Sequence, residues 1–148
     1  MNFRNISKFK GKNILIAGLG KSGISTVNKL AGFAGSITAV DSNPYLEIGN
    51  ELESLKKIKK FKLELIIKSS INRSKKILDI IDLVIISPGI SNEIPLIKYA
   101  DRLKIPVWSE IELGWSILDS NERKNTIAVT GTNGKTTVVR LMQKILSG

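Results

Sequence analysis

A glycine-rich turn between a short apolar run and an amphipathic stretch is the feature that most constrains the fold of this chain. The turn reads Gly18-Leu19-Gly20-Lys21-Ser22-Gly23; it follows the run Asn13–Ala17 and opens the stretch Ser22–Leu30. In such a strand–turn–helix unit, the first glycine permits a tight turn, the second lets the backbone approach an anion, and the third lets the helix pack on the strand. The pattern therefore predicts a phosphate-binding turn at the end of a parallel strand.

The same alternation of short and longer segments continues along most of the chain. Short β-branched runs alternate with amphipathic stretches, which is typical of βαβ units and a parallel sheet covered on both faces. The predicted strands are Asn13–Ala17, Ser36–Val40, Leu63–Lys68, Leu83–Ser87, Pro106–Trp108 and Thr126–Thr130. The predicted helices are Ser22–Leu30, Tyr45–Lys60, Ser74–Ile80, Ile94–Leu103, Glu110–Leu118 and a last helix from Lys135 to the end.

A polar stretch near the end divides this pattern into two unequal parts. Residues Asp119–Asn125 lack apolar periodicity, so they are the best linker candidate. We therefore expect a Rossmann-like α/β domain over residues 1–119, with a parallel sheet of about five strands and flanking helices. A linker over 120–125 would join it to a truncated second α/β domain over 126–148, of which the first strand, phosphate loop and helix are present.

Composition removes several classes of chemistry. The chain has no cysteine and no histidine, which excludes disulfides, thiol catalysis and a histidine base. Its net charge of +10 comes mostly from lysine, including the cluster Lys56–Lys62, and aromatic residues make up only 5%. We interpret that cluster as a solvated helix face and expect no nucleic-acid partner. No apolar run approaches the roughly 20 residues of a membrane helix, and no signal peptide is visible, so we expect a cytoplasmic protein without membrane contact.

An acidic residue strengthens the nucleotide interpretation of the first glycine turn. Asp41 ends the second predicted strand, 21 residues after Gly20. A carboxylate at that place can accept hydrogen bonds from a ribose or a base. The turn does not specify which nucleotide binds, so a stand-alone domain that senses NAD or ATP and the cofactor domain of a dehydrogenase both remain open at this point.

A second glycine-rich turn follows the apolar run Thr126–Val129. It reads T-G-T-N-G-K-T-T over residues 130–137 and carries the Gly-Lys-Thr of a P-loop, although Val129 stands at the first glycine position of the full pattern. In a P-loop the backbone amides hold phosphates, the lysine reaches the outer phosphate oxygens and the hydroxyl binds magnesium. The predicted ATP-binding residues are Gly131, Thr132, Asn133, Gly134, Lys135, Thr136 and Thr137, with Thr136 as a magnesium ligand.

The second turn resembles the ATP loop of the Mur ligases, which extend the peptide of the bacterial cell-wall precursor. Three further segments resemble the D-glutamate-adding members of this family in order and spacing: GLGKSGIS at Gly18–Ser25, SPGIS at Ser87–Ser91 and IPVWSEIEL at Ile105–Leu113. The resemblance covers nearly the whole chain. It implies that the first domain holds the UDP part of UDP-N-acetylmuramoyl-L-alanine rather than a dinucleotide.

The resemblance also assigns residues to that substrate. Asn43 stands where the family often has arginine. The assigned residues match family positions beside the diphosphate, beside uracil and ribose, and in the turn after the fourth strand, and they include the remaining glycines of the first turn. They are Gly18, Gly20, Lys21, Ser22, Gly23, Asp41, Ser42, Asn43, Ser87, Pro88 and Gly89.

In such ligases ATP phosphorylates the substrate carboxylate, and the amine of D-glutamate then attacks the acyl phosphate. Lys135, Thr136 and Mg²⁺ would neutralise charge on the transferred phosphoryl group, and Lys135 and Thr136 are therefore the predicted catalytic residues. The resemblance implies that the other groups the family needs would lie downstream of Gly148. We therefore expect this fragment to bind UDP but to be inactive alone.

Four conspicuous side chains near the fifth strand are expected to have no catalytic role. Glu110 and Glu112 open a helix, where carboxylates complement the helix dipole, and Trp108 and Trp115 are interpreted as packing residues. The strand within Thr126–Thr130 would lack neighbours, and an exposed edge of this kind tends to pair with a second chain. The sequence therefore predicts that the chain can form a dimer through this strand.

Overall fold

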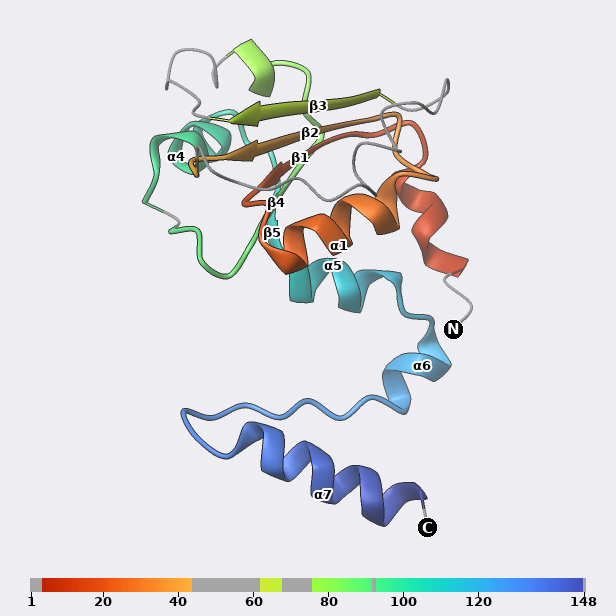
Figure 1. The fold of residues 1–148 in the computed structure, drawn as a ribbon. Helices are drawn as coiled ribbons and strands as arrows, with labels where there is room; N and C mark the ends of the chain where they lie inside the picture. The colour runs from red at the N-terminus through yellow and green to blue at the C-terminus, as the bar shows by residue number, and fades with distance from the viewer. Residues whose placement is uncertain (1–3, 44–61, 68–75, 92, 148) are drawn as a thin grey trace. The chain divides into compact units, whose positions relative to one another are not determined.

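The computed structural model describes residues 4–43, 62–67, 76–91 and 93–147 (Figure 1). The chain divides into two compact units, Met1–Leu118 and Asp119–Gly148. Among the described residues, no helix is long and apolar enough to cross a membrane.

A five-stranded sheet forms the centre of the first unit. Its strand order is β3-β2-β1-β4-β5, and every neighbouring pair is parallel, which confirms the predicted Rossmann-like α/β fold. From β1 the strands are added in one direction, to β2 and β3, and β4 and β5 are then added on the other side of β1. The order of the strands therefore switches between the neighbours β1 and β4, where the connections leave toward opposite sides. The strands are β1 (Asn13–Ala17), β2 (Ser36–Asp41), β3 (Lys62–Ile67), β4 (Leu83–Ile86) and β5 (Val107–Ser109).

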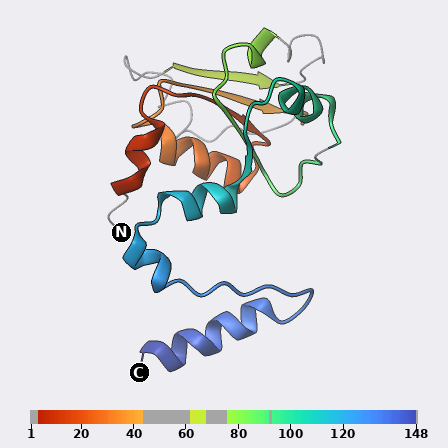
Figure 2. The same ribbon diagram turned by 180° about the vertical axis from the view of Figure 1, so that it is seen from behind.

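Helices cover both faces of this sheet (Figures 1 and 2). The helices α1 (Lys21–Leu30) and α5 (Glu110–Ile117), with the 3₁₀ helix η1 (Arg4–Phe9), pack on one face. On the other face lies α4 (Pro95–Arg102). The helices α1, α4 and α5 begin and end within one or two residues of their predicted bounds, whereas η1 was not predicted. The predicted helix Tyr45–Lys60 and the first residues of Ser74–Ile80 lie outside the described residues, whereas residues 76–78 are helical.

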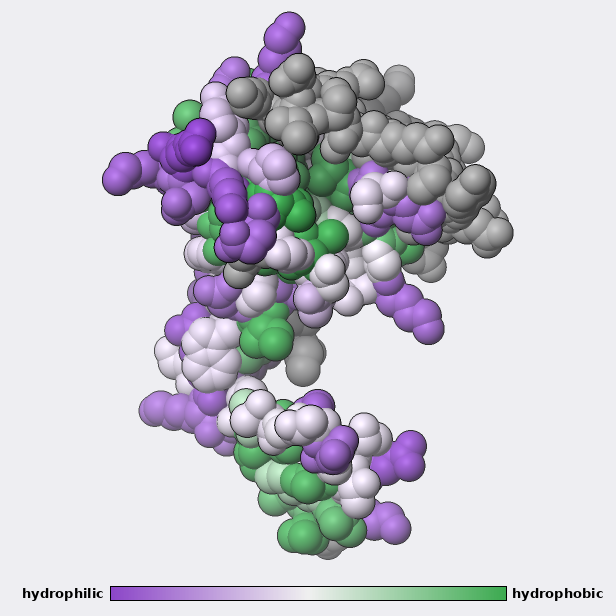
Figure 3. Space-filling model, turned by 90° about the vertical axis from the view of Figure 1, so that its left-hand side faces the viewer, coloured by the Kyte–Doolittle hydropathy of each residue, from purple (hydrophilic) through white to green (hydrophobic). Residues whose placement is uncertain are grey.

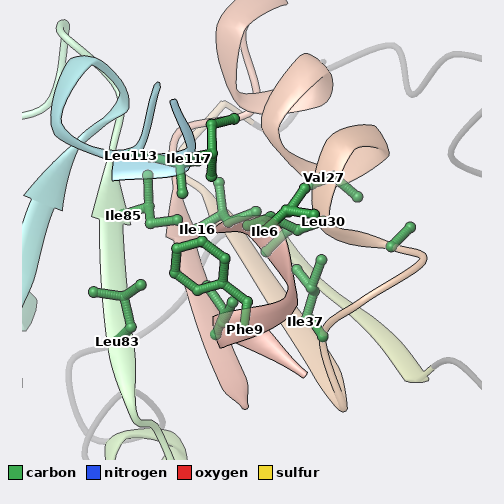
Figure 4. Close-up of a cluster of buried hydrophobic side chains, with 14 of the residues drawn as sticks. Ile6, Phe9, Ile16, Val27, Leu30, Ile37, Leu83, Ile85, Leu113 and Ile117 are labelled. Carbon is green, nitrogen blue, oxygen red and sulfur yellow. The ribbon is translucent and has the colours of Figure 1, made fainter. Parts of the chain in front are cut away.

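The larger apolar cluster fills the space between the sheet, α1, α5 and η1 (Figure 4). Ile16 from the central strand β1 is fully buried there, and Val27 and Leu30 face it from α1. Phe9 of η1 meets Trp108 of β5 edge-on, with ring centroids 6.2 Å apart. Trp108 is thus a packing residue, as predicted, whereas Trp115 is 49% exposed and that prediction is wrong.

The smaller cluster lies under α4 on the opposite face. It includes Leu15 and Val84, which point away from the first cluster because side chains alternate along a strand. Leu96 and Ala100 of α4 cover them at helical spacing. This two-sided burial explains why the strands read as continuous apolar runs.

Two side chains of η1 join it to the end of α5. The side-chain amide of Asn5 donates to the carbonyl of Leu118 at 2.8 Å, and the ammonium of Lys8 donates to the carbonyl of Ser116, also at 2.8 Å. These carbonyls belong to the last turn of α5, where carbonyl groups lack partners within the helix and a cation is favourable. The first and last elements of this unit are therefore hydrogen-bonded to each other.

The second unit differs from its prediction at its first element. The predicted strand Thr126–Thr130 has no regular secondary structure, because a strand needs a hydrogen-bonded neighbour and the described residues of this unit provide none. The stretch interpreted as a linker contains a short helix, α6 (Ser120–Lys124), which Asp119 and Glu122 close with a capping box. The predicted last helix is present as α7 (Lys135–Ser147).

None of the described residues of this second unit is buried. Several large apolar side chains of α7 and of the segment before it are exposed, and Figure 3 shows the apolar surface of this unit as green atoms. An amphipathic helix with no covered face gains little from the hydrophobic effect. The exposed apolar residues are Ile127, Val138, Val139, Leu141, Ile145 and Leu146.

The turn after α4 provides a test of local backbone strain. Lys104 has a φ of 58°, in the left-handed region that favours glycine. This backbone conformation is held by a hydrogen bond that the amide of Ile105 donates to the carbonyl of Ala100 at 3.0 Å. The same arrangement is found at helix ends where glycine is common. We expect Lys104→Gly to raise the free energy of unfolding by about 0.5–1 kcal/mol, since relief of strain exceeds the added entropy of the unfolded chain.

Urea denaturation checks this prediction. The control is Lys98→Gly in the interior of α4, which should lower the free energy of unfolding by about 1 kcal/mol because the backbone there is helical. Equal losses for both variants would contradict the assignment of strain to Lys104.

Candidate functional site

The register of the sheet sets the ends of β1, β4 and β5 level with one another and with Val40, the residue before the end of β2. Val40 pairs with Ala17, Ala17 with Ile86, and Ile86 with Ser109. These residues form one row across β2, β1, β4 and β5. The next residue in each chain segment therefore stands at the carboxyl edge, where open α/β sheets bind ligands.

The next row consists of Asp41, the last residue of β2, and of Gly18, Ser87 and Glu110, which follow β1, β4 and β5. Alternation along the strands gives them the same side as Ala39, Ile16 and Ile85, which belong to the cluster under α1 and α5. The row thus lies beside the start of α1. Asp41, Gly18 and Ser87 were predicted from the sequence to belong to the site. Glu110 was not.

The glycine turn is held against this row by very close contacts. Gly18 has a φ of 90°, and a Cβ atom there would lie 3.0 Å from Cβ of Ser87. A Cβ atom on Gly23 would lie 1.9 Å from the carbonyl oxygen of Gly18, which no side chain can tolerate. Around Gly20 no atom lies within 4 Å of such a position, so space is open there. This is the division of roles expected for the three glycines.

The start of α1 offers amide groups to that open space. Gly20 is the N-cap and makes no side-chain cap hydrogen bond. The amides of Lys21, Ser22 and Gly23 precede the first intrahelical hydrogen bond, which runs from Ile24 to the carbonyl of Gly20 at 3.0 Å. Lys21 and Ser22 are exposed. Free amides, a helix dipole and an ammonium group together suit an anion such as a diphosphate.

Asp41 holds the glycine turn to the end of β2. Its two carboxylate oxygens accept hydrogen bonds from the backbone amides of Leu19, at 2.6 Å, and Asn43, at 2.7 Å. The sequence predicts that Asp41 accepts hydrogen bonds from a ribose or a base. Both oxygens already have backbone partners, so the carboxylate fixes the shape of two loops whatever else it binds.

Ser87 joins the same turn to the end of β5. Its hydroxyl oxygen lies 3.1 Å from the carbonyl oxygen of Gly18 and 2.7 Å from Oε1 of Glu110. The amide of Ser87 also donates to the carbonyl of Ala17 at 3.0 Å. The Ser87 hydroxyl therefore lies between Glu110 and the Gly18 carbonyl, and the Ser87 amide holds β4 to the end of β1 beside the loop that Asp41 anchors.

A capping box fixes the start of α5. The hydroxyl of Ser109 accepts from the amide of Glu112 at 3.1 Å, and the carboxylate of Glu112 accepts from the amide of Ser109 at 2.6 Å. The backbone amide of Ser109, and next its hydroxyl, lower the pKa of Glu112. Glu112 thus does more than complement the helix dipole, because it sets the backbone that presents Glu110.

The remaining predicted residues of this site border the row. Ser42, Asn43, Pro88 and Gly89 are exposed in the loops after β2 and β4. The loop after β4 turns back through a hydrogen bond from the amide of Ile90 to the carbonyl of Ser87, at 2.9 Å. A separate cavity of about 460 Å³ lies beside β4, β5 and α4, lined by Ile86, Glu93, Ile97, Lys98, Asp101, Val107, Ser109 and Glu112.

The second glycine turn has the backbone of a phosphate loop but is fully exposed. Gly131 and Gly134 have φ values of 147° and 79°, which favour glycine. The ammonium of Lys135 donates to the carbonyl of Gly131 and lies 3.4 Å from the carbonyl oxygen of Thr132. The amides at the start of α7 precede its first helical hydrogen bond, from Val138 to Gly134. These residues fit a phosphate group and, through Thr136, a hydrated Mg²⁺. Among the described residues no cluster of three or more acidic, histidine or cysteine side chains could hold a metal ion.

Comparison with known proteins places the sequence near one group of enzymes. Residues 12–109 match the family model described as "Mur ligase MurD-like, N-terminal domain". The UDP-N-acetylmuramoylalanine–D-glutamate ligase of Elusimicrobium minutum is 39% identical over 95% of this chain and 28% of its own length. The enzyme of the same name from Bdellovibrio bacteriovorus is 32% identical over 98% of this chain and 29% of its own length. The chain thus spans less than a third of these relatives.

Solved structures of other enzymes share the fold. The tRNA N6-threonylcarbamoyladenosine dehydratase of E. coli has a TM-score of 0.55 and 18% identity, covering 72% of this chain and 52% of its own. Shikimate 5-dehydrogenase from Listeria monocytogenes has a TM-score of 0.52 and 12% identity, covering 73% of this chain and 49% of its own. Identities this low show the fold alone.

The contacts of the glycine turn predict that alanine is tolerated at Gly20 but not at Gly23. Gly23→Ala should lower the free energy of unfolding by at least about 2 kcal/mol, because the new Cβ atom clashes with backbone that cannot retreat without opening the sheet edge. Helix propensity alone would favour alanine by about 1 kcal/mol, so a loss must come from the clash. Gly20→Ala, the matched control, should cost no more than about 1 kcal/mol. Urea denaturation of both variants tests this, and similar values would contradict the packing.

The lowered pKa of Glu112 predicts a pH-dependent contribution to stability. A carboxyl whose pKa falls on folding stabilises the protein above its unfolded pKa, which is near 4.5, and loses that contribution as pH falls through the folded value. Glu112→Gln should therefore melt at a lower temperature than the parent at pH 7, and the gap should narrow progressively as pH falls below 4.5. Thermal melts from pH 7 to pH 3 measure it; a gap that stayed constant would show that the charge does not contribute.

Proposed function

This chain belongs to the family of MurD-like N-terminal domains of Mur ligases, and from that premise we propose that its first unit binds the UDP part of UDP-N-acetylmuramoyl-L-alanine. The observation that carries the proposal is the row formed by Asp41, Gly18, Ser87 and Glu110 at the start of α1. It brings together segments that are far apart in the sequence and that all resemble the family's motifs.

The diphosphate would lie over Gly20, at the start of α1. The open space at this glycine, the amides of Lys21 and Ser22, and the ammonium of Lys21 all favour an anionic group. The hydroxyl of Ser87 and the exposed turn at Pro88 and Gly89 would border it from β4. No contact in this set requires a dinucleotide.

Uracil and ribose would lie at the loop after β2. Because both carboxylate oxygens of Asp41 accept from backbone amides, we propose that Asp41 shapes this loop while the exposed Ser42 and Asn43 contact the nucleoside. Asn43 replaces the arginine that the family often has, so its contact would be a neutral hydrogen bond rather than a charged one.

The second unit would supply part of an ATP site. Gly131, Gly134 and the amides at the start of α7 would hold phosphates, while Lys135 and Thr136 would act on the transferred phosphoryl group and on Mg²⁺. When bound, Mg²⁺ would neutralise phosphate charge. The loop's support is incomplete, because Ile127–Val129 has no strand neighbour among the described residues.

For the whole protein we propose a cytoplasmic ATP-dependent ligase of peptidoglycan precursor synthesis that joins D-glutamate to UDP-N-acetylmuramoyl-L-alanine through an acyl phosphate. Relatives of that name, at about three and a half times this length, support the proposal. The 148 residues alone would bind UDP, lack ligase activity, and be able to pair with a second chain through the exposed apolar residues of the second unit.

Isothermal titration calorimetry with UDP, NAD and ATP tests this function. We expect UDP to bind more tightly than NAD, because the proposed contacts to UDP all lie in the first unit, and ATP to bind weakly, because its loop has no strand neighbour among the described residues. Lys21→Ala should weaken UDP binding roughly 10-fold, as expected for loss of one charge-assisted hydrogen bond. Lys29→Ala, in the last turn of the same helix, is the matched control and should leave the affinity unchanged. Equal or tighter NAD binding would refute the proposal in favour of a nucleotide-sensing domain.

A further inference from the structure

The hydroxyl of Ser87 has two acceptors but only one proton to donate. The carbonyl oxygen of Gly18 lies at 3.1 Å and the carboxylate oxygen Oε1 of Glu110 at 2.7 Å. A hydrogen bond to a carboxylate is shorter and stronger than one to a neutral carbonyl, so Glu110 is the preferred acceptor. Glu110 is therefore the group that selects the direction of the Ser87 side chain.

That direction matters because Ser87 lies directly beneath the glycine turn. Its Oγ would lie 3.2 Å from a Cβ atom at Gly18 and 3.3 Å from one at Gly23. Ser87 is thus packed between the end of β1 and the first turn of α1. A serine side chain has three staggered rotamers, and the one that Ser87 adopts makes these contacts and the bond to Glu110 together.

Glu110 is itself held in place from behind. It is the first residue of α5, and the capping box of Ser109 and Glu112 fixes the backbone on both sides of it. It is also half-buried, which limits the other directions that its side chain can take. A fixed carboxylate can therefore act on Ser87 as a rigid acceptor.

We propose that Glu110 is a positioning residue of the substrate site, which acts through Ser87. The carboxylate holds the Ser87 side chain in the rotamer that packs beneath the glycine turn, so that the turn keeps the shape in which the amides at the start of α1 face the diphosphate. This inference rests on the proposed UDP site, although the conformation of Ser87 exists without any ligand. Glu110 touches no substrate atom in this scheme.

Two variants of Glu110 separate positioning from charge. Glu110→Gln and Glu110→Ala both remove the negative charge near the diphosphate and at the start of α5, but only glutamine keeps an oxygen that accepts from Ser87. Charge effects on UDP affinity and helix stability therefore cancel between them. We expect Glu110→Ala to bind UDP at least about 5-fold more weakly than Glu110→Gln, because Ser87 must then be ordered when the ligand binds.

A double-mutant cycle with Ser87→Ala shows whether Glu110 acts through Ser87. In the Ser87→Ala background, the alanine and glutamine variants of Glu110 should bind UDP equally. Equal binding in the native background, or a difference that persists without Ser87, would overturn the proposal.

A measurement without ligand keeps this inference distinct from the proposed function. The Hα–Hβ coupling constants of Ser87, measured by NMR, report its χ1 rotamer. They should indicate a single rotamer in the parent and in Glu110→Gln, and averaged rotamers in Glu110→Ala. If the parent does not bind UDP, the proposed function fails while the couplings still decide the role of Glu110; a single rotamer in all three proteins would refute that role.

Discussion

Four parallel strands are aligned in one row at the carboxyl edge of the sheet, and the polar contacts of the candidate site depend on that register. Because Val40, Ala17, Ile86 and Ser109 are level, the residues that follow them meet at one edge. Shifting one strand by a single residue would turn its next side chain to the opposite face of the sheet. The apolar clusters on both faces prevent such a shift, so the cores of this unit also fix its chemistry.

Close backbone contact connects that register to the first helix. Gly23 lets α1 approach within contact distance of the Gly18 carbonyl, while Asp41 holds Leu19 from the other side. The turn is thereby fixed before any ligand arrives, and binding need not order it. Preorganisation of this kind lowers the entropic cost of association.

Local patterns made much of this fold predictable from the sequence. Strand β1 and the glycine turn follow from a β-branched run and three glycines, all of which act over a few residues. Glu110 was missed because its role depends on the level at which β4 and β5 end, and spacing along the chain does not contain that information. The predicted strand Thr126–Thr130 was wrong for a related reason, since a strand needs a neighbour that its own residues cannot supply.

The hydrogen bonds from Asn5 and Lys8 to the last turn of α5 place the entry and the exit of the first unit side by side. A domain whose ends meet can be moved between proteins as a cassette, because inserting it into a loop of a host stretches neither partner. The same adjacency permits circular permutation, in which a short bridge replaces the original ends. In a protein built from successive domains, a domain with adjacent ends is easily added or removed. The segments joined to its two ends leave from the same place, so neither has to cross the surface of the domain.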